Sequence, residues 1–230
     1  MPIYLLTDDL VFPPPQVSEP DGLLAIGGDL REQRLLLAYR MGIFPWYSEG
    51  EPILWWSPDP RLVLYPEELK VSKSLRKIIK QRRFQVTMDT AFTQVMAACA
   101  SVWRPEQQGT WITGEMITAY TRLHHRGYAH SVEVWDRGEL AGGLYGVSLG
   151  RCFFGESMFC RQSNTSKVAL YYLVEYVKSF RFDLIDCQVT TEHLLSLGAR
   201  EIQRRQFLTE LKHSLQVSTL KGKWTCAQIC

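Results

Sequence analysis

The sequence has no apolar run of about 18 residues, the length at which a segment becomes a candidate membrane span. Its first residues also lack the basic and then apolar pattern of a secretory signal peptide. The six cysteines contain no C-x-x-C pair, and the five histidines show no metal-ligand spacing beside them. These absences predict a cytoplasmic protein with reduced cysteines, no membrane contact and no bound metal.

Signatures of bound cofactors are missing as well. The sequence contains no Walker loop, no dinucleotide fingerprint after a strand and no H-E-x-x-H motif. Residues 146–150 (GVSLG) fit the G-x-S-x-G pattern of serine hydrolases. That pattern needs a strand that turns into a helix, whereas residues 151–154 (RCFF) continue as a second strand. We therefore expect a mechanism without a cofactor and disfavour a serine hydrolase.

The composition that is present is typical of a globular protein. The chain has 230 residues, of which 46% are hydrophobic, so it can form one large domain or two unequal ones. Its formal net charge is only +2 at pH 7. Any affinity for nucleic acid must therefore come from a local patch of positive charge.

Hydrophobic periodicity and capping residues predict a mixture of helices and strands. Asp29 with Glu32 three residues later fits a capping box, and Ser72 and Thr113 are candidate N-caps. The predicted helices cover about residues 29–42, 72–83, 90–100, 113–127 and 164–180. The predicted strands are a short one from residue 62 and others at about 84–88, 131–135, 140–149, 152–159 and 183–189.

Aromatic residues are concentrated near the N-terminus. Trp46, Trp55 and Trp56 fall within eleven residues, in segments that prolines interrupt. Such segments cannot form a regular buried element, so the tryptophans either build a small aromatic core or provide a stacking platform for a base.

The predicted helix at 72–83 carries an unbalanced positive charge. Leu75, Ile78 and Ile79 form its apolar stripe, and no acidic residue accompanies the basic ones on the remaining surface. The helix is therefore a candidate for phosphate contacts, although a charge run is often merely solvated. The basic residues are Lys73, Arg76, Lys77, Lys80, Arg82 and Arg83.

Three polar residues fall on two predicted strands. Glu156 is flanked by aromatic residues and methionine, so its carboxyl group is either solvated on an outer face or a partly desolvated functional group. Strand alternation predicts that Asp186 and Gln188 share one face. If the two strands are neighbours, these three groups could surround an amine, hold it and accept its proton. Alternatively, Asp186 is a strand-end residue bonded to a turn.

Several blocks of sequence resemble the bacterial leucyl/phenylalanyl-tRNA-protein transferases over about residues 10–212. The resemblance implies transfer of Leu or Phe, and less well Met, from aminoacyl-tRNA to the N-terminal Arg or Lys of a protein. That transfer marks the acceptor for degradation as an N-degron. The blocks are FPW (44–46), WWSPDPR (55–61), GTWIT (109–113), SVEVW (131–135), GESMF (155–159), DCQ (186–188) and SLGA (196–199), with Ile202 and Arg204.

The resemblance also implies the fold and the domains. We expect an α+β protein in which residues 1–62 form a small N-terminal domain. Residues 63–230 would form a larger, acyltransferase-like domain with a mixed sheet and flanking helices, similar to N-acetyltransferases but without their acyl-CoA.

Residue roles follow from the same resemblance. Trp46 and Trp111 would flank the 3′-terminal adenosine, and the basic helix would hold the tRNA acceptor stem. Glu156 would anchor an α-amino group, while Asp186 with Gln188 would relay the proton from the attacking amine. An apolar pocket would hold the amino-acid side chain, lined by Phe153, Met158, Leu173 and Val177.

Leu173 and Val177 depart from the pattern, because we expect the family to carry aromatic residues at these two positions, and here Tyr172 and Tyr176 lie beside them. This departure bears on which amino-acid side chains the pocket prefers.

Two other classes stay open at this point. An acyl-CoA-dependent N-acetyltransferase would need a glycine-rich pyrophosphate loop before a helix, and residues 161–165 (RQSNT) contain no glycine. A non-catalytic RNA-binding module would keep the basic helix and the tryptophans, but it would have no use for Glu156 and Asp186.

Overall fold

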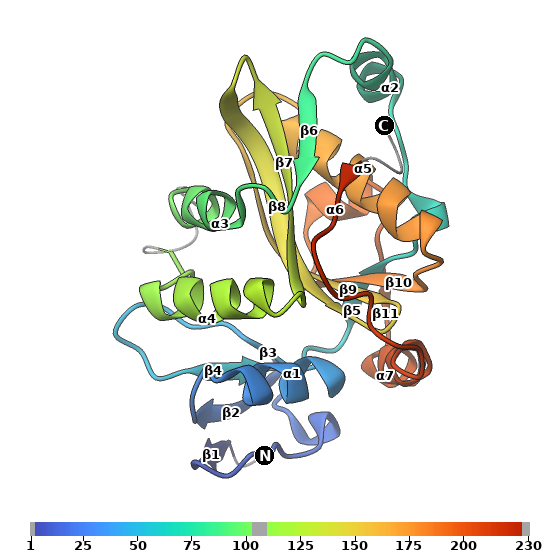
Figure 1. Cartoon of the computed structure of the whole chain (residues 1–230). Helices are drawn as coiled ribbons and strands as arrows, with labels where there is room; N and C mark the ends of the chain where they lie inside the picture. The colour runs from blue at the N-terminus through green and yellow to red at the C-terminus, as the bar shows by residue number, and fades with distance from the viewer. Residues whose placement is uncertain (1–2, 103–109, 227–230) are drawn as a thin grey trace.

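The computed structural model of the protein describes residues 3–102 and 110–226, which build two β-sheets with helices packed around them (Figure 1). Gly109 of the GTWIT block and Cys230 lie outside the described residues. The smaller sheet has four strands in the order β1-β2-β4-β3 and is mixed, because β1 runs parallel to β2 whereas β2 and β3 run antiparallel to β4. Its strands are β1 (Tyr4–Leu6), β2 (Leu23–Gly27), β3 (Phe44–Pro45) and β4 (Leu54–Trp56).

The larger sheet has seven strands in the order β11-β5-β10-β9-β8-β7-β6. It is also mixed, since β10 runs parallel to β9 and all other neighbours are antiparallel. These two mixed sheets confirm the predicted α+β class. The strands are β5 (Arg61–Leu64), β6 (Gln85–Met88), β7 (Ala129–Asp136), β8 (Glu139–Leu149), β9 (Cys152–Cys160), β10 (Leu184–Gln188) and β11 (Arg200–Ile202).

Helices cover both faces of the larger sheet. Helices α3 and α4 lie on one face and α5 on the other, and α1 packs beside α4 (Figure 1). Two short 3₁₀ helices are at Pro15–Val17 and Pro66–Glu68. The α-helices are α1 (Glu32–Arg40), α2 (Lys73–Lys80), α3 (Phe92–Ala100), α4 (Gly114–His125), α5 (Thr165–Ser179), α6 (Glu192–Ser196) and α7 (Arg204–Ser214).

Local capping explains where several helices begin. The Ser72 hydroxyl accepts from the Leu75 N–H at the start of α2, and the Thr113 hydroxyl does the same for α4, as predicted. The predicted capping box at Asp29 is wrong, because α1 begins at Glu32 and its N-cap residue makes no side-chain bond. The Asp29 carboxylate instead accepts the Arg31 N–H in the preceding turn.

The two sheets share one hydrophobic core. Buried side chains of the small sheet, such as Leu24 and Trp55, belong to the same cluster as Val95 and Phe154 under the large sheet. The sheets divide between Trp56 and Arg61, immediately before the predicted domain boundary at residue 62. The division into two domains stays a prediction.

Strands β9 and β10 lie side by side over only part of their length. The parallel pairing joins residues 152–154 to residues 184–186, after which β9 continues to Cys160 while β10 ends at Gln188. Gln188 has a φ of 64°, in the left-handed region that a residue of this kind rarely adopts. The two strands therefore part, and a cavity opens between them.

Within the described ranges, no helix is both long enough and apolar enough to cross a membrane.

Candidate active site

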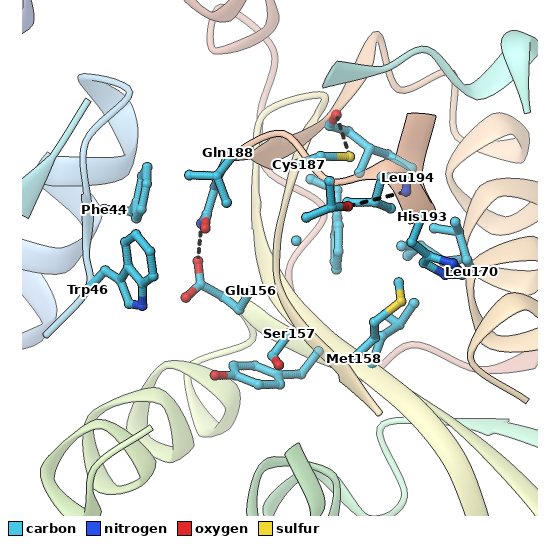
Figure 2. A pocket seen from close by; sticks show the side chains of 18 of the residues that line it. Phe44, Trp46, Glu156, Ser157, Met158, Leu170, Cys187, Gln188, His193 and Leu194 are labelled. Atoms are coloured by element: carbon cyan, nitrogen blue, oxygen red, sulfur yellow. Dashed lines mark hydrogen bonds between the residues drawn. The ribbon is translucent and has the colours of Figure 1, made fainter. Parts of the chain in front are cut away.

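The cavity between β9 and β10 has a volume of about 520 Å³ (Figure 2). Most of its wall is apolar and comes from β8, β9, β10 and α5. The polar part of the wall includes Glu156, Ser157 and Gln188. A largely apolar cavity with a few polar groups at fixed positions is typical of a site for a small organic group.

Three of the four residues predicted for an apolar pocket line this cavity: Phe153, Met158 and Leu173. The fourth, Val177, lies one turn further along α5 and is fully buried in the core between α5 and the sheet. Leu170, one turn before Leu173, lines the cavity in its place. An α-helix presents residues three or four apart to the same side, and the cavity reaches only the earlier turn of α5.

The tryptophans have separate roles. Trp55 is fully buried in the core and donates its indole N–H to the Gly27 carbonyl, 2.9 Å away. Trp46 and Trp111 line the cavity, and Trp46 is only half-buried. The indole N–H of Trp56 donates to the Trp46 carbonyl at 2.7 Å, which fixes the backbone at the cavity edge. The aromatic segment therefore supplies both a core residue and a cavity wall.

Glu156 is a buried carboxyl group at the polar end of the cavity. Only 8% of the residue is exposed, so the solvated alternative is excluded. Its Oε1 accepts from the Gln188 amide nitrogen and from the Tyr39 hydroxyl, each at 2.7 Å. Its Oε2 is buried and has no hydrogen-bond partner among the residues that the structure describes. Figure 2 shows the carboxyl group directed toward the side of the cavity on which Trp46 lies.

Burial raises the pKa of Glu156 to about 7, although the hydrogen bonds from Tyr39 and Gln188 act to lower it. A carboxyl group that titrates near neutral pH can exchange a proton with an amine at little cost. Its unpartnered oxygen is also a place where an ammonium group could bind, since buried polar atoms normally have a partner.

Asp186, which we expect to act on the amine together with Gln188, is not among the described residues that line the cavity. Its side chain is fully buried and its two carboxylate oxygens accept from Arg61 at 2.8 and 2.7 Å. The Arg61 guanidinium is enclosed between the rings of Phe44 and Phe207, with distances of 4.8 and 4.7 Å to the centroids. Asp186 is thus held in a buried ion pair.

The link between Asp186 and the cavity is the backbone of Gln188. The Gln188 N–H donates to Asp186 Oδ1 at 2.9 Å, and the Gln188 side chain reaches Glu156. The Gln188 amide reaches Glu156 on the side of the sheet where Tyr39 also bonds this carboxyl group, and the backbone of Gln188 has a positive φ. Asp186 therefore fixes the conformation that brings Gln188 into the cavity.

The six basic residues predicted for tRNA are all exposed. Helix α2 ends at Lys80, before Arg82 and Arg83, and Arg82 has a φ of 46°. Within residues 3–102 and 110–226, none of the six pairs with a carboxylate. The positive surface therefore remains available to phosphate groups.

Several residues at the site could not be identified from the sequence. Tyr39 and Tyr120 lie on helices without any motif, and their approach to Glu156 depends on how α1 and α4 pack. Arg61 ends the WWSPDPR block, which is the one signal that the sequence offers for it. Phe44 and His193 line the cavity and also lie in or near conspicuous blocks.

The site combines an apolar cavity with a buried carboxyl group whose pKa is raised to about 7, an arrangement typical of an enzyme active site. Residues 63–212 match the family model described as leucyl/phenylalanyl-tRNA protein transferase, and residues 28–59 match the model of its N-terminal domain. The chain therefore belongs to the leucyl/phenylalanyl-tRNA-protein transferases, a family of aminoacyltransferases, and the resemblance noted in the sequence is confirmed.

Individual relatives agree with this assignment. The leucyl/phenylalanyl-tRNA-protein transferase of Desulfatibacillum aliphaticivorans is 59% identical over 225 residues, which are 98% of this chain and 97% of that protein. The protein of the same name from Syntrophus aciditrophicus is 60% identical and covers 98% of this chain and 94% of its own length.

Among solved structures, an aminoglycoside acetyltransferase from an uncultured soil metagenomic sample overlaps with a TM-score of 0.36 at 13% identity, over 50% of this chain and 87% of that chain. That likeness is too partial to support a conclusion.

Proposed function

We propose that this protein transfers Leu or Phe, and less well Met, from aminoacyl-tRNA to the N-terminal Arg or Lys of acceptor proteins in the cytoplasm. The transfer marks those proteins for degradation as N-degrons. The observation that carries the proposal is the apolar cavity with the unpartnered Glu156 Oε2 at its polar end. An aminoacyl ester has the matching pair of features, an apolar side chain and an α-amino group one carbon away.

The apolar wall supports the choice of side chain. The wall contains unbranched or γ-branched side chains that can pack against Leu or against a flat Phe ring. They are Met158, Leu170 and Leu173. Unbranched Met also fits, because a thioether adapts to irregular apolar space. A β-branched side chain carries its bulk next to the α-carbon, close to the amino group that Glu156 would bind, so we propose that Val and Ile are rejected by shape.

Glu156 would bind the donor's α-amino group. The ammonium form would donate to the free Oε2, while Oε1 stays bonded to Tyr39 and Gln188. This ion pair would fix the ester carbonyl relative to the cavity. Orientation of this kind can supply about 7 to 11 kcal/mol of the barrier in a reaction between two bound groups.

The acceptor amine then attacks the ester carbonyl. A C–N bond forms, the C–O bond to the terminal ribose breaks, and the proton lost by the amine ends on the ribose hydroxyl that leaves. Because Gln188 uses its amide N–H on Glu156, its amide oxygen is the acceptor available to the attacking amine. We propose that Gln188 positions this amine and that Asp186, paired with Arg61, acts by positioning Gln188.

The tRNA would lie across the cavity mouth and α2. Trp46 and Trp111 would stack on the terminal adenosine, and the six basic residues at and after α2 would contact acceptor-stem phosphates. Phosphate contacts carry no sequence information, which suits an enzyme that accepts tRNAs for more than one amino acid.

A single-turnover assay tests the proposal. The protein is mixed with tRNA charged with labelled Leu, Phe, Met or Ile and with a peptide that begins with Arg, and the labelled peptide is measured. We expect transfer from Leu and Phe, slower transfer from Met and none from Ile. Label retained on every tRNA, or equal transfer from Ile, would contradict the proposal. A parallel reaction with acetyl-CoA in place of the tRNA is expected to give no product.

A further inference from the structure

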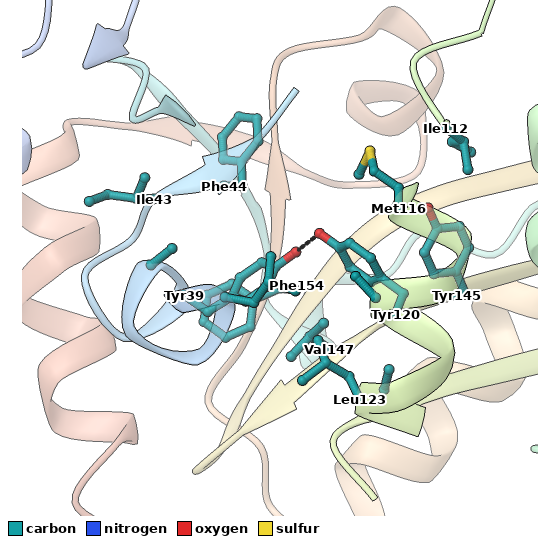
Figure 3. Close-up of a cluster of buried hydrophobic side chains, with 14 of the residues drawn as sticks. Tyr39, Ile43, Phe44, Ile112, Met116, Tyr120, Leu123, Tyr145, Val147 and Phe154 are labelled. Atoms are coloured by element: carbon teal, nitrogen blue, oxygen red, sulfur yellow. Dashed lines mark hydrogen bonds between the residues drawn. The ribbon is translucent and has the colours of Figure 1, made fainter. Parts of the chain in front are cut away.

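Two buried tyrosine hydroxyls are linked to Glu156 by hydrogen bonds. Tyr39 comes from α1 and Tyr120 from α4, and at most 1% of either residue is exposed. The Tyr39 hydroxyl donates to Glu156 Oε1 at 2.7 Å, and the two tyrosine hydroxyls are hydrogen-bonded to each other (Figure 3). A hydroxyl has one proton, so Tyr39 accepts from Tyr120 while it donates to Glu156. The hydrogen bonds therefore run in one direction, from Tyr120 to Tyr39 and from Tyr39 to Glu156.

Neither tyrosine lines the cavity. Any influence on a bound substrate must therefore pass through Glu156. Burial, more than any other factor, raises the pKa of both phenols well above 10, so both remain donors throughout the neutral range. A permanent donor stabilises the ionised carboxylate, because a hydrogen bond to a charged acceptor is stronger than one to a neutral acceptor.

We infer that Tyr39 is a positioning residue that keeps Glu156 ionised and aimed at the cavity near neutral pH, and that Tyr120 fixes the direction of the Tyr39 hydroxyl. Tyr39 belongs to the helix between β2 and β3, so the N-terminal part of the chain contributes to the chemistry of the large sheet. Its kinetic consequence rests on the proposed function, whereas its effect on the Glu156 carboxyl group does not.

Every other charged or titratable neighbour of Glu156 also has to be considered. Asp186 on β10 raises the pKa of Glu156 slightly, and Arg61 on β5 neutralises Asp186 through their ion pair. Tyr145 on β8 lies edge-on to Tyr120, with ring centroids 6.0 Å apart. Tyr39 and the uncharged amide of Gln188 donate to Glu156 Oε1 at 2.7 Å, and a hydrogen bond from Tyr120 also acts to lower the pKa of Glu156.

The substitution Tyr39→Phe tests the inference, because it removes the donor and keeps the ring. The Glu156 pKa is measured by carboxyl ¹³C NMR during a pH titration, with the signal assigned from Glu156→Gln. We expect the pKa to rise by about one to two pH units, as the loss of a hydrogen bond to a charged group would produce. Tyr120→Phe is expected to raise it by a smaller amount.

The rate of single-turnover transfer should show the same change. In Tyr39→Phe the rate at pH 7 should fall by about 5-fold to 50-fold and recover toward pH 9, because the acid limb of the pH–rate profile moves to higher pH with the Glu156 pKa. A purely structural defect would lower the rate equally at every pH. Rescue at high pH therefore distinguishes the inferred role from a loss of folding.

Tyr65→Phe is the matched control. The Tyr65 hydroxyl donates to Glu210 at 2.7 Å, the same length as in the Tyr39 bond, but neither residue lines the cavity. This variant should leave both the Glu156 titration and the pH profile unchanged. An unchanged Glu156 pKa in Tyr39→Phe would overturn the inference. If that pKa rises but the wild-type protein transfers no amino acid, the inference stands and the proposed function fails.

Discussion

At the residue scale, the site depends on how two buried carboxyl groups use their hydrogen bonds. Glu156 uses one oxygen on protein donors and leaves the other free, whereas Asp186 uses both oxygens on Arg61. The free oxygen suits a ligand, and the saturated carboxylate suits a structural pair. Two acids that look alike in the sequence thus acquire different tasks from their surroundings.

Loss of Asp186 should cost both stability and rate. Asp186→Ala would leave the Arg61 charge buried without its partner, which we expect to reduce the free energy of unfolding by about 3 to 5 kcal/mol. Urea denaturation measures this change. As a control, Glu68→Ala breaks the exposed pair with Arg200 and should cost about 1 kcal/mol or less. Transfer by Asp186→Ala should be slower with tRNA affinity retained, and a wild-type rate would remove Asp186 from the mechanism.

The proposed function gives Trp46 a role in donor binding. Trp46→Ala should raise the KM for aminoacyl-tRNA about 10-fold, since stacking on a base contributes roughly 1 to 3 kcal/mol. The rate constant at saturating donor should change less, because the proposal places the tryptophan on the base and not at the reacting carbonyl. Steady-state kinetics with charged tRNA as the varied substrate gives both values. A KM equal to that of the wild type would refute the stacking role.

At the element scale, α2 is an exposed helix whose positive charges have no internal partner among the described residues. Each Lys or Arg that contacts a phosphate displaces counterions and adds to the salt dependence of binding. For a helix that only has to be solvated, an excess of positive charge is unfavourable, because like charges on neighbouring turns repel one another.

Neutralising α2 should therefore flatten the salt dependence of tRNA binding. The triple variant Lys73→Gln, Lys77→Gln, Lys80→Gln should lower the slope of log affinity against log salt by about 2 to 3, because each phosphate that a lysine neutralises adds about 0.7 to 0.9 to that slope. The matched control neutralises Arg205 and Lys212, which are exposed on α7. Filter binding between about 50 and 200 mM salt gives the slope for the wild type and for each variant. If the α2 variant has the same slope as the wild type, α2 is excluded from the tRNA interface.

Elements defined by local signals could be predicted from the sequence, and contacts between elements could not. Ser72 and Thr113 cap their helices through bonds within four residues, so the chain alone contains the information. The pairing of Asp186 with Arg61 depends on the antiparallel register of β5 and β10, which no local pattern encodes. Val177 follows the helical period of α5, but the depth of the cavity decides that this turn packs into the core.

At the scale of the whole molecule, the site joins both sheets. Tyr39 approaches Glu156 from α1, Trp46 follows β3, and Gln188 ends β10. The shared hydrophobic core holds these segments in register. In the proposed function the buried carboxyl group of Glu156 at their meeting point binds the donor, but its burial weakens the folded state.

That conflict predicts how stability depends on pH. The pKa of Glu156 is about 7 in the folded protein and 4.5 is its ordinary value, so the folded state binds this proton more tightly than the unfolded state. The contribution of Glu156 to stability is therefore greatest below about pH 4.5 and falls by about 3 kcal/mol as the pH rises through 7. Glu156→Gln should abolish this fall, while Glu68→Gln should not. Denaturant titrations from about pH 5 to 8 give the free energy of unfolding over the range in which the effect develops. If this free energy depends on pH in the same way in Glu156→Gln and in the wild type, the Glu156 pKa is not raised.

The most direct measurement is a crystal structure with a stable analogue of the donor, phenylalanine joined to adenosine through an amide. We predict the phenyl ring in the cavity beside Met158 and Leu173, the adenine against Trp46 or Trp111, and the α-ammonium nitrogen at about 2.7 to 3.0 Å from Glu156 Oε2. An analogue bound elsewhere, or one whose amino group points away from Glu156, would contradict the proposal that this cavity holds the aminoacyl donor.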